Sequence, residues 1–194
     1  MTTADDILDF WLVEIGEKGW YEQSDSVDQA IRNRFLPAWE AAETLTHSWQ
    51  DSADGALAGL ILTDQFPRNM FRGDPRAFAT DPLAVRLADA AINLGQDLAI
   101  PTPQRQFFYM PYEHAEDLDL QNRAIALFSQ RMPGESLEHA ELHRDTIARF
   151  GRFPWRNAAL GRTPTAAEDR VMAAGGYGAL VSGKLSLADP GEMV

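Results

Sequence analysis

Two short stretches of the sequence combine the residue types that bind anions and exchange protons. The stretch DQFPRNMFRG covers residues 64–73, and RFGRFPWRN, residues 149–157, repeats its Phe-Pro and Arg-Asn pairs. A guanidinium group presents a planar fork of N–H donors to carboxylate or phosphate, and an asparagine amide bonds exposed backbone groups. The repeated pattern therefore predicts a polar ligand-binding site, to which the candidate contributors are Arg68, Asn69, Arg149, Arg152, Arg156 and Asn157.

Helical spacing predicts that one carboxylate and one imidazole point into the core. Asp64 shares a face with Leu57, Leu60 and Ile61, and His143 shares a face with Ala140 and Ile147. A buried carboxylate is unfavourable unless it is paired, and an imidazole changes its charge near neutral pH. Asp64 and His143 are therefore candidate catalytic residues, with Asp64 orienting His143. Both patterns are also typical of structural ion pairs and hydrogen-bonded core side chains.

A third stretch, FFYMPYEHAEDLDLQ at residues 107–121, supplies Tyr109, His114 and Gln121 as further candidate ligand contacts. His114 and Gln121 are seven residues apart and share one face of the helix predicted there. They form a second polar pair on an apolar face.

The histidines do not follow a recognised metal-binding pattern. His139 and His143 are four residues apart, as in helical metal sites, but the sequence between them does not give HExxH. The chain also lacks GxGxxG, GxxxxGK[ST] and GxSxG motifs and contains no cysteine. We predict neither a metal nor a cofactor, and the absence of cysteine excludes disulfides and thiol chemistry.

Composition limits the partners that the chain can have. The net charge of −12 opposes binding to nucleic acid. Arginine outnumbers lysine fifteen to two, and guanidinium groups suit partly buried pairing with carboxylate or phosphate. The acidic N-terminus does not resemble a signal peptide, and the longest apolar stretch is too short to span a membrane. We expect a soluble cytoplasmic protein with no nucleic-acid or membrane partner.

Apolar residues recur at helical rather than alternating spacing, which predicts an all-α fold with about seven helices and no significant sheet. Residues 1–174 are expected to form one antiparallel helical domain. The glycine-rich segment 175–194 is expected to be a loosely packed or disordered tail.

Several helix boundaries can be predicted from capping and proline signals. One helix should run from about residue 54 to 66 and stop before Pro67. Others should cover about 111–132 and 136–150. Asp25 or Ser26 is expected to cap an early helix, and Thr165 with Glu168 to form a capping box.

Four motifs together resemble a bacterial family catalogued as domain of unknown function 924: ILDFW (7–11), DQFPRNMFRG, FFYMPYEHAED (107–117) and RFGRFPWRNAALGR (149–162). The resemblance extends from about Ile7 to Glu168. It implies an all-α fold like that of tetratricopeptide-repeat (TPR) arrays and no established reaction. Trp155 stands where the family usually has histidine, and Ala115 where it usually has serine, so imidazole and hydroxyl chemistry is not available at these two positions.

Three interpretations of the polar residues remain open. They form a pocket for a small carboxylate or phosphate metabolite, with or without acid–base catalysis by His143. Alternatively, they form a structural knot in which each arginine binds a helix end. In the third interpretation the array is a scaffold for a protein or peptide partner, and the polar cluster only stiffens it.

Overall fold

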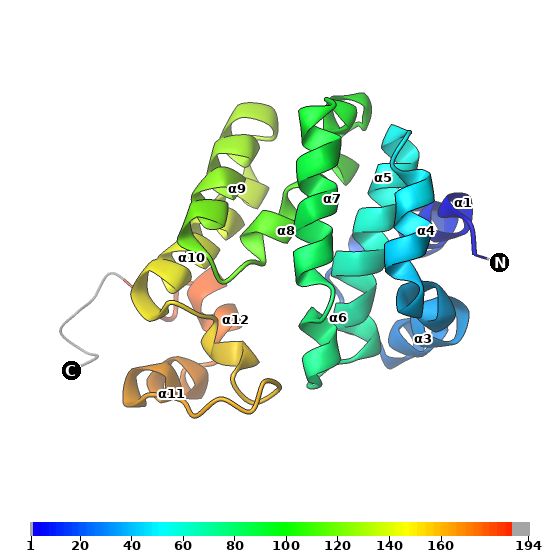
Figure 1. Ribbon diagram of the computed structural model, residues 1–194. Coiled ribbons are helices and arrows are strands. Elements are labelled where there is room, and N and C mark those ends of the chain that lie inside the picture. Colours follow the sequence, from blue (N-terminus) through cyan, green and yellow to red (C-terminus); the bar gives the residue numbers. More distant parts are fainter. Residues whose placement is uncertain (1, 188–194) are drawn as a thin grey trace. The chain divides into compact units, whose positions relative to one another are not determined.

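The computed structural model describes residues 2–187, and every regular element in that range is helical (Figure 1). The predicted all-α class is therefore confirmed, although the helices are more numerous and shorter than expected. The chain divides into two compact units, residues 1–111 and 112–194. The predicted single domain and the predicted likeness to TPR arrays both stay predictions.

The first unit packs its helices around buried aromatic side chains. Trp11 meets Phe66 edge to face at 5.6 Å, and Phe35 packs on Phe66 at 4.9 Å. Its α-helices and two π-helices are, in chain order, α1 (Ala4–Leu8), a π-helix (Asp9–Ile15), α2 (Gly16–Gly19), α3 (Asp25–Glu40), α4 (Ala42–Trp49), α5 (Ala53–Leu60), a π-helix (Ile61–Gln65), α6 (Phe66–Met70) and α7 (Asp81–Asn93). Short 3-10 helices cover Pro75–Phe78, Gln96–Ala99 and Gln104–Phe108.

The helix that carries Asp64 continues past Pro67, so the predicted end before this proline is wrong. Between α5 and α6 the chain widens into the π-helix Ile61–Gln65, and Pro67 then lies in the first turn of α6. Proline has no N–H, so it cannot donate to the carbonyl of Thr63 four residues earlier. The hydroxyl of Thr80 donates to that carbonyl instead, at 2.6 Å, and accepts from the Trp39 indole at 3.1 Å.

The second unit contains a helical hairpin. Its elements are α9 (Leu118–Arg131), α10 (Glu135–Phe150), a 3-10 helix (Pro154–Arg156), α11 (Ala166–Ala173) and α12 (Tyr177–Val181), while α8 (Met110–Glu113) spans the boundary between the units in the sequence. Helices α9 and α10 pack side by side (Figure 1). The end of α10 is close to the predicted one, and Gly151 follows it with a φ of 69°.

The helix predicted over residues 111–132 is in fact two helices, so that prediction is wrong. Asp117 has an extended backbone, and its carboxylate accepts the N–H groups of Asp119 and Leu120 at 2.9 and 3.0 Å. This side-chain cap starts α9 afresh and leaves His114 in the turn that follows α8.

Side-chain caps also set two other helix starts. Ser24 caps α3, accepting the N–H of Val27 at 3.4 Å, so the predicted caps at Asp25 and Ser26 are wrong. The predicted capping box between Thr165 and Glu168 is confirmed at the start of α11.

Part of the segment predicted to be a loose tail is helical. Helix α12 lies within it, and its Ala179 and Leu180 are buried. Residues 188–194 lie outside the described residues, so the tail as a whole stays a prediction. Within residues 2–187, no helix combines the length and the apolar character needed to cross a lipid bilayer.

We expect Thr80→Val to destabilise the protein by about 1–3 kcal/mol, because it leaves the Thr63 carbonyl without a donor in a partly buried position. Unfolding by denaturant would measure the difference. Thr44→Val, at an exposed position on α4, is the matched control and should be close to neutral. Equal effects of the two substitutions would contradict this account of how the helix passes Pro67.

Candidate functional site

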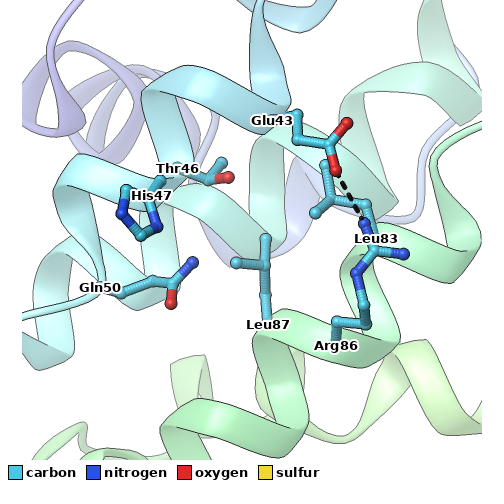
Figure 2. A pocket seen from close by; sticks show the side chains of 7 residues that line it. All are labelled: Glu43, Thr46, His47, Gln50, Leu83, Arg86 and Leu87. Carbon is cyan, nitrogen blue, oxygen red and sulfur yellow. Dashed lines mark hydrogen bonds and ion pairs between the residues drawn. The ribbon is translucent and has the colours of Figure 1, made fainter.

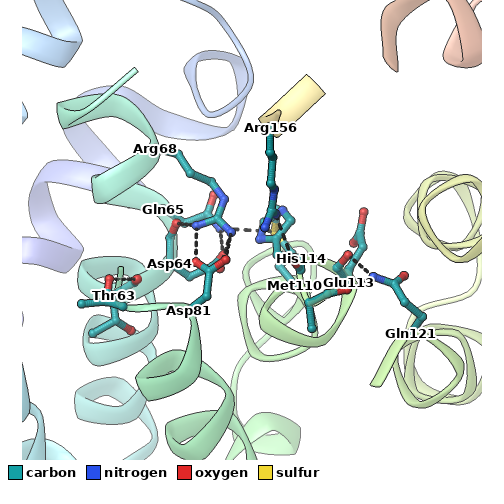
Figure 3. Close-up of polar contacts among 12 residues, drawn as sticks. Thr63, Asp64, Gln65, Arg68, Asp81, Met110, Glu113, His114, Gln121 and Arg156 are labelled. Carbon is teal, nitrogen blue, oxygen red and sulfur yellow. Dashed lines mark hydrogen bonds and ion pairs between the residues drawn. The ribbon is translucent and has the colours of Figure 1, made fainter. Parts of the chain in front are cut away.

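In the first unit, the predicted catalytic residue Asp64 is buried and paired. Its carboxylate lies 3.3 Å from Arg68 and accepts the side-chain amide of Gln65. Arg68 also donates to the Asp64 carbonyl at 2.5 Å and to both carboxylate oxygens of Asp81 at 3.1 and 3.2 Å (Figure 3). The guanidinium group thus joins the π-helix to the start of α7.

Two other predicted ligand contacts of this unit bind carboxylates of the same unit. The amide of Asn69 donates to Asp28 at 2.9 Å, and Arg72 pairs with the same carboxylate. The hydroxyl of Tyr109 donates to Asp97 at 2.6 Å, and both residues are buried. Asn69 and Tyr109 therefore have clear structural roles.

A hollow of about 420 Å³ lies between α4 and α7 in the first unit (Figure 2). Glu43 and Arg86 pair there at 3.2 Å, and both side chains are largely exposed. None of the predicted site residues lines it. The residues that do are Glu43, Thr46, His47, Gln50, Leu83, Arg86 and Leu87.

In the second unit, Glu113 and His143 form a buried pair. Nδ1 of His143 lies 2.8 Å from Oε1 of Glu113 and 2.9 Å from the carbonyl oxygen of His139, one turn earlier on α10. The predicted inward orientation of His143 is confirmed, since only 9% of the residue is exposed. Its carboxylate partner is Glu113, at the end of α8.

These contacts determine which ring nitrogen of a neutral His143 carries the proton. Both partners of Nδ1 are acceptors, so Nδ1 must donate, and the lone pair then resides on Nε2. No hydrogen bond to Nε2 is found among the described residues. A carboxylate that holds Nδ1–H in this way fixes the ring and leaves Nε2 able to accept a proton, as in general-base sites.

Burial raises the pKa of Glu113, but the nearby imidazoles of His143, His114 and His139 outweigh this effect. The pKa of Glu113 therefore lies below its ordinary value. Three imidazoles therefore act on the charge of one buried carboxylate.

Aromatic side chains surround the ring of His143. Phe153 and Trp155 meet it edge to face at 5.3 and 6.1 Å, and the ring of His114 lies 6.2 Å away in the same orientation. Tyr177 packs against it at 4.7 Å. Phe153 is buried, whereas His114, Trp155 and Tyr177 keep part of their surface exposed. The pair is thus enclosed by rings, some of which reach solvent.

Most of the arginines predicted to bind a ligand contact protein groups in the same unit. Arg152 donates to both oxygens of the buried Glu168 at 2.6 and 2.7 Å. Arg156 is buried, donates to the carbonyl of His114 at 2.8 Å and lies 4.7 Å from the Phe153 ring centre. Arg149 is exposed at the end of α10, 5.8 Å from the ring centre of Phe150.

The remaining predicted contacts organise the turns of the second unit. The Gln121 amide donates to the carbonyls of Glu113 and Ala115 at 2.6 and 2.7 Å and so holds the end of α8 against α9 (Figure 3). Asn157 is buried, and its carbonyl accepts the N–H of Arg162 at 2.8 Å.

Comparison with known proteins adds the family. A family model described as a bacterial protein of unknown function, DUF924, matches residues 7–176. The chain belongs to this family. The solved structure of a protein of unknown function from Agrobacterium tumefaciens is 44% identical, with a TM-score of 0.84 over 89% of this chain and 97% of that one. No relative is found among curated proteins.

In this DUF924 protein, sequence patterns identified His143 as facing inward but did not identify Glu113 as its partner. The spacing of four between His139 and His143 was the available signal, since it puts both on one side of α10. Tyr177 was missed because it lies in the segment predicted to be loose. Within the described part of the chain, no group of three His, Cys, Asp or Glu residues could hold a metal ion.

The single cluster predicted to unite both Phe-Pro stretches would draw on both units, and it stays a prediction. Within the first unit, Asp64 contacts Arg68. Within the second, His143 and Arg156 both contact the ring of Phe153, and His114 contacts His143. The polar residues of each stretch are therefore locally organised.

The contribution of Glu168 to stability should be lost as the pH falls. Hydrogen bonds from Arg152 are the main cause that lowers the pKa of Glu168 from 4.5 to about 2. The stabilisation is then complete above the unfolded-state pKa and disappears as the pH falls toward 2. We expect the difference in unfolding free energy between wild type and Glu168→Gln to shrink over this range.

Denaturant unfolding at a series of pH values tests this expectation. Arg152→Gln removes the arginine that pairs with Glu168, so the unfolding free energy of this variant should also depend less on pH over this range. A difference between wild type and Glu168→Gln that is constant down to the lowest pH would contradict the assigned role of Arg152.

Proposed function

We propose that this protein binds a small molecule in its second unit and that Glu113 and His143 act on it by acid–base chemistry. The observation that carries the proposal is the double contact of Nδ1 with Glu113 and with the His139 carbonyl. This contact orients the imidazole and leaves Nε2 as the proton acceptor.

The choice of partner for Glu113 supports a role beyond stability. In the same unit, Glu168 pairs with Arg152 and Glu116 pairs with Arg162, whose charges are permanent. Glu113 pairs instead with an imidazole, whose charge changes in the physiological pH range. A pair that only stabilised the fold would be stronger with arginine as the cation, because arginine is charged at all physiological pH values.

The partly exposed rings of Trp155, Tyr177 and His114 supply the surface on which a small ligand would lie. The sequence predicted a carboxylate or phosphate ligand. Among the arginines near His143, Arg156 is the candidate for such an anion, since it lies over the ring of Phe153, which also contacts His143. A multiply charged anion is less well supported, because Arg152 is already paired with Glu168.

A second candidate is a non-catalytic helical protein in which these motifs only hold turns together. The contacts of Gln121 with α8 and of Arg68 with Asp64 and Asp81 favour it, because they are what a structural knot requires. This candidate explains the arginines well but gives no reason for an imidazole beside Glu113.

A thermal-shift screen separates the two candidates. We expect at least one compound among small carboxylates, phosphates and neutral carbonyl compounds to stabilise the wild type. A ligand that binds only the folded state adds about 2.7 kcal/mol at a hundred times its Kd. The shift should be retained in His47→Gln, a control at an exposed histidine of the first unit, and lost in His143→Gln.

Arg156→Lys tells whether the ligand is an anion, because an ammonium group cannot reproduce the two-pronged contact of a guanidinium. If no compound stabilises the wild type, or if shifts are equal in all variants, the structural candidate becomes the better account.

A further inference from the structure

His139 and Tyr177 form a second hydrogen-bonded pair beside the first. Nδ1 of His139 lies 2.5 Å from the hydroxyl oxygen of Tyr177. The carbonyl of the same histidine accepts from His143 at 2.9 Å. His139 therefore touches the Glu113–His143 pair through its backbone and the phenol through its side chain.

The chain reversal before α12 places Tyr177 at this position. Gly175 and Gly176 have φ values of 117° and 61°, which side chains rarely allow, and Tyr177 follows as the first residue of α12. Its ring packs on His143 at 4.7 Å and on Trp155 at 5.3 Å. The phenol thus lies against both histidines of α10.

From this geometry we infer that Tyr177 is the acid of the site and that His139 returns its proton, an inference that rests on the proposed function of His143. A phenol has an ordinary pKa of about 10, and an imidazole one of about 6.5. When His139 is neutral with the lone pair on Nδ1, that nitrogen accepts a hydrogen bond from the phenol hydroxyl. When His139 is protonated, its Nδ1–H donates to the phenol oxygen. The pair therefore moves a proton in either direction.

A base and an acid side by side suit the enolisation of a carbonyl compound, in which one proton leaves carbon and another reaches oxygen. Nε2 of His143 takes a proton from the carbon next to the carbonyl, and the electron pair of the broken C–H bond moves toward the carbonyl oxygen. That oxygen takes the hydroxyl proton of Tyr177, which gives the enol. The phenolate then recovers a proton from protonated His139. His143 releases to solvent the proton that it took from carbon, and His139 takes one from solvent, so both pairs return to their starting states.

The exposure of the two pairs matches these roles. His139 and Tyr177 keep part of their surface exposed, so protons can be replaced from water, whereas Glu113 and His143 are buried. His114 is a further titratable group beside the Glu113–His143 pair, and it also acts on the charge of Glu113.

The test is a pH titration of the protein labelled with ¹³C at the Cζ atom of tyrosine and with ¹⁵N in histidine. The signal of Tyr177 is assigned with Tyr177→Phe. We expect this Cζ signal to shift at the same pH at which the ring nitrogens of His139 titrate. The step should disappear in His139→Gln. Tyr21, whose hydroxyl donates to Gln106 at 2.6 Å, is the internal control and should show no such step.

Absence of the step, or its persistence in His139→Gln, would overturn the inference. That failure is distinct from failure of the proposed function. A compound whose thermal shift depends on His143 would still establish the first pair as a binding site, even if Tyr177 and His139 share no proton.

Discussion

A carboxylate removed from water must find donors or a cation, and this constraint organises both units. Asp28 and Asp64 in the first unit, and Glu116 and Glu168 in the second, each pair with an arginine of their own unit. The arginine of each pair is charged at all physiological pH values. Glu113 differs, because its partner is His143, whose charge depends on pH. The proposed chemistry follows from that one difference.

The elements around Glu113 are arranged so that this pair can exist. The break between α8 and α9 ends the first helix at Glu113, and the Gln121 amide fixes its carbonyl from the next helix. Helix α10 then presents His143 to the carboxylate and the His139 carbonyl to the same ring nitrogen. The ring of Phe153 packs edge to face against the imidazole of His143. Local capping rules therefore position the pair, since each contact depends on where a helix starts or stops.

Sequence patterns predicted those features that depend on short-range spacing. The helical class, the capping box at Thr165 and the inward orientation of Asp64 and His143 all follow from intervals of three and four residues. They did not predict that the helix continues past Pro67. The donor that replaces the missing N–H of this proline is the Thr80 hydroxyl, thirteen residues later in the sequence.

Partners distant in sequence also explain what was missed at the site. Glu113 and His143 are thirty residues apart, and His139 and Tyr177 are joined across 38. Arg68, Arg152 and Arg156 contact acids and carbonyls that no local pattern specifies. Residue spacing predicts which face of a helix carries a side chain, but the partner of that side chain depends on how the helices pack.

The tautomer of neutral His143 tests the central claim most directly. Long-range proton–nitrogen correlation spectra of the ¹⁵N-histidine-labelled protein distinguish a protonated ring nitrogen from one that carries a lone pair. The geometry predicts that Nδ1 carries the proton, held by Glu113 and the His139 carbonyl, and that Nε2 carries the lone pair. A neutral ring protonated at Nε2 would contradict the account, because Nδ1 would then have no proton to donate to its two acceptors and Nε2 could not act as the base.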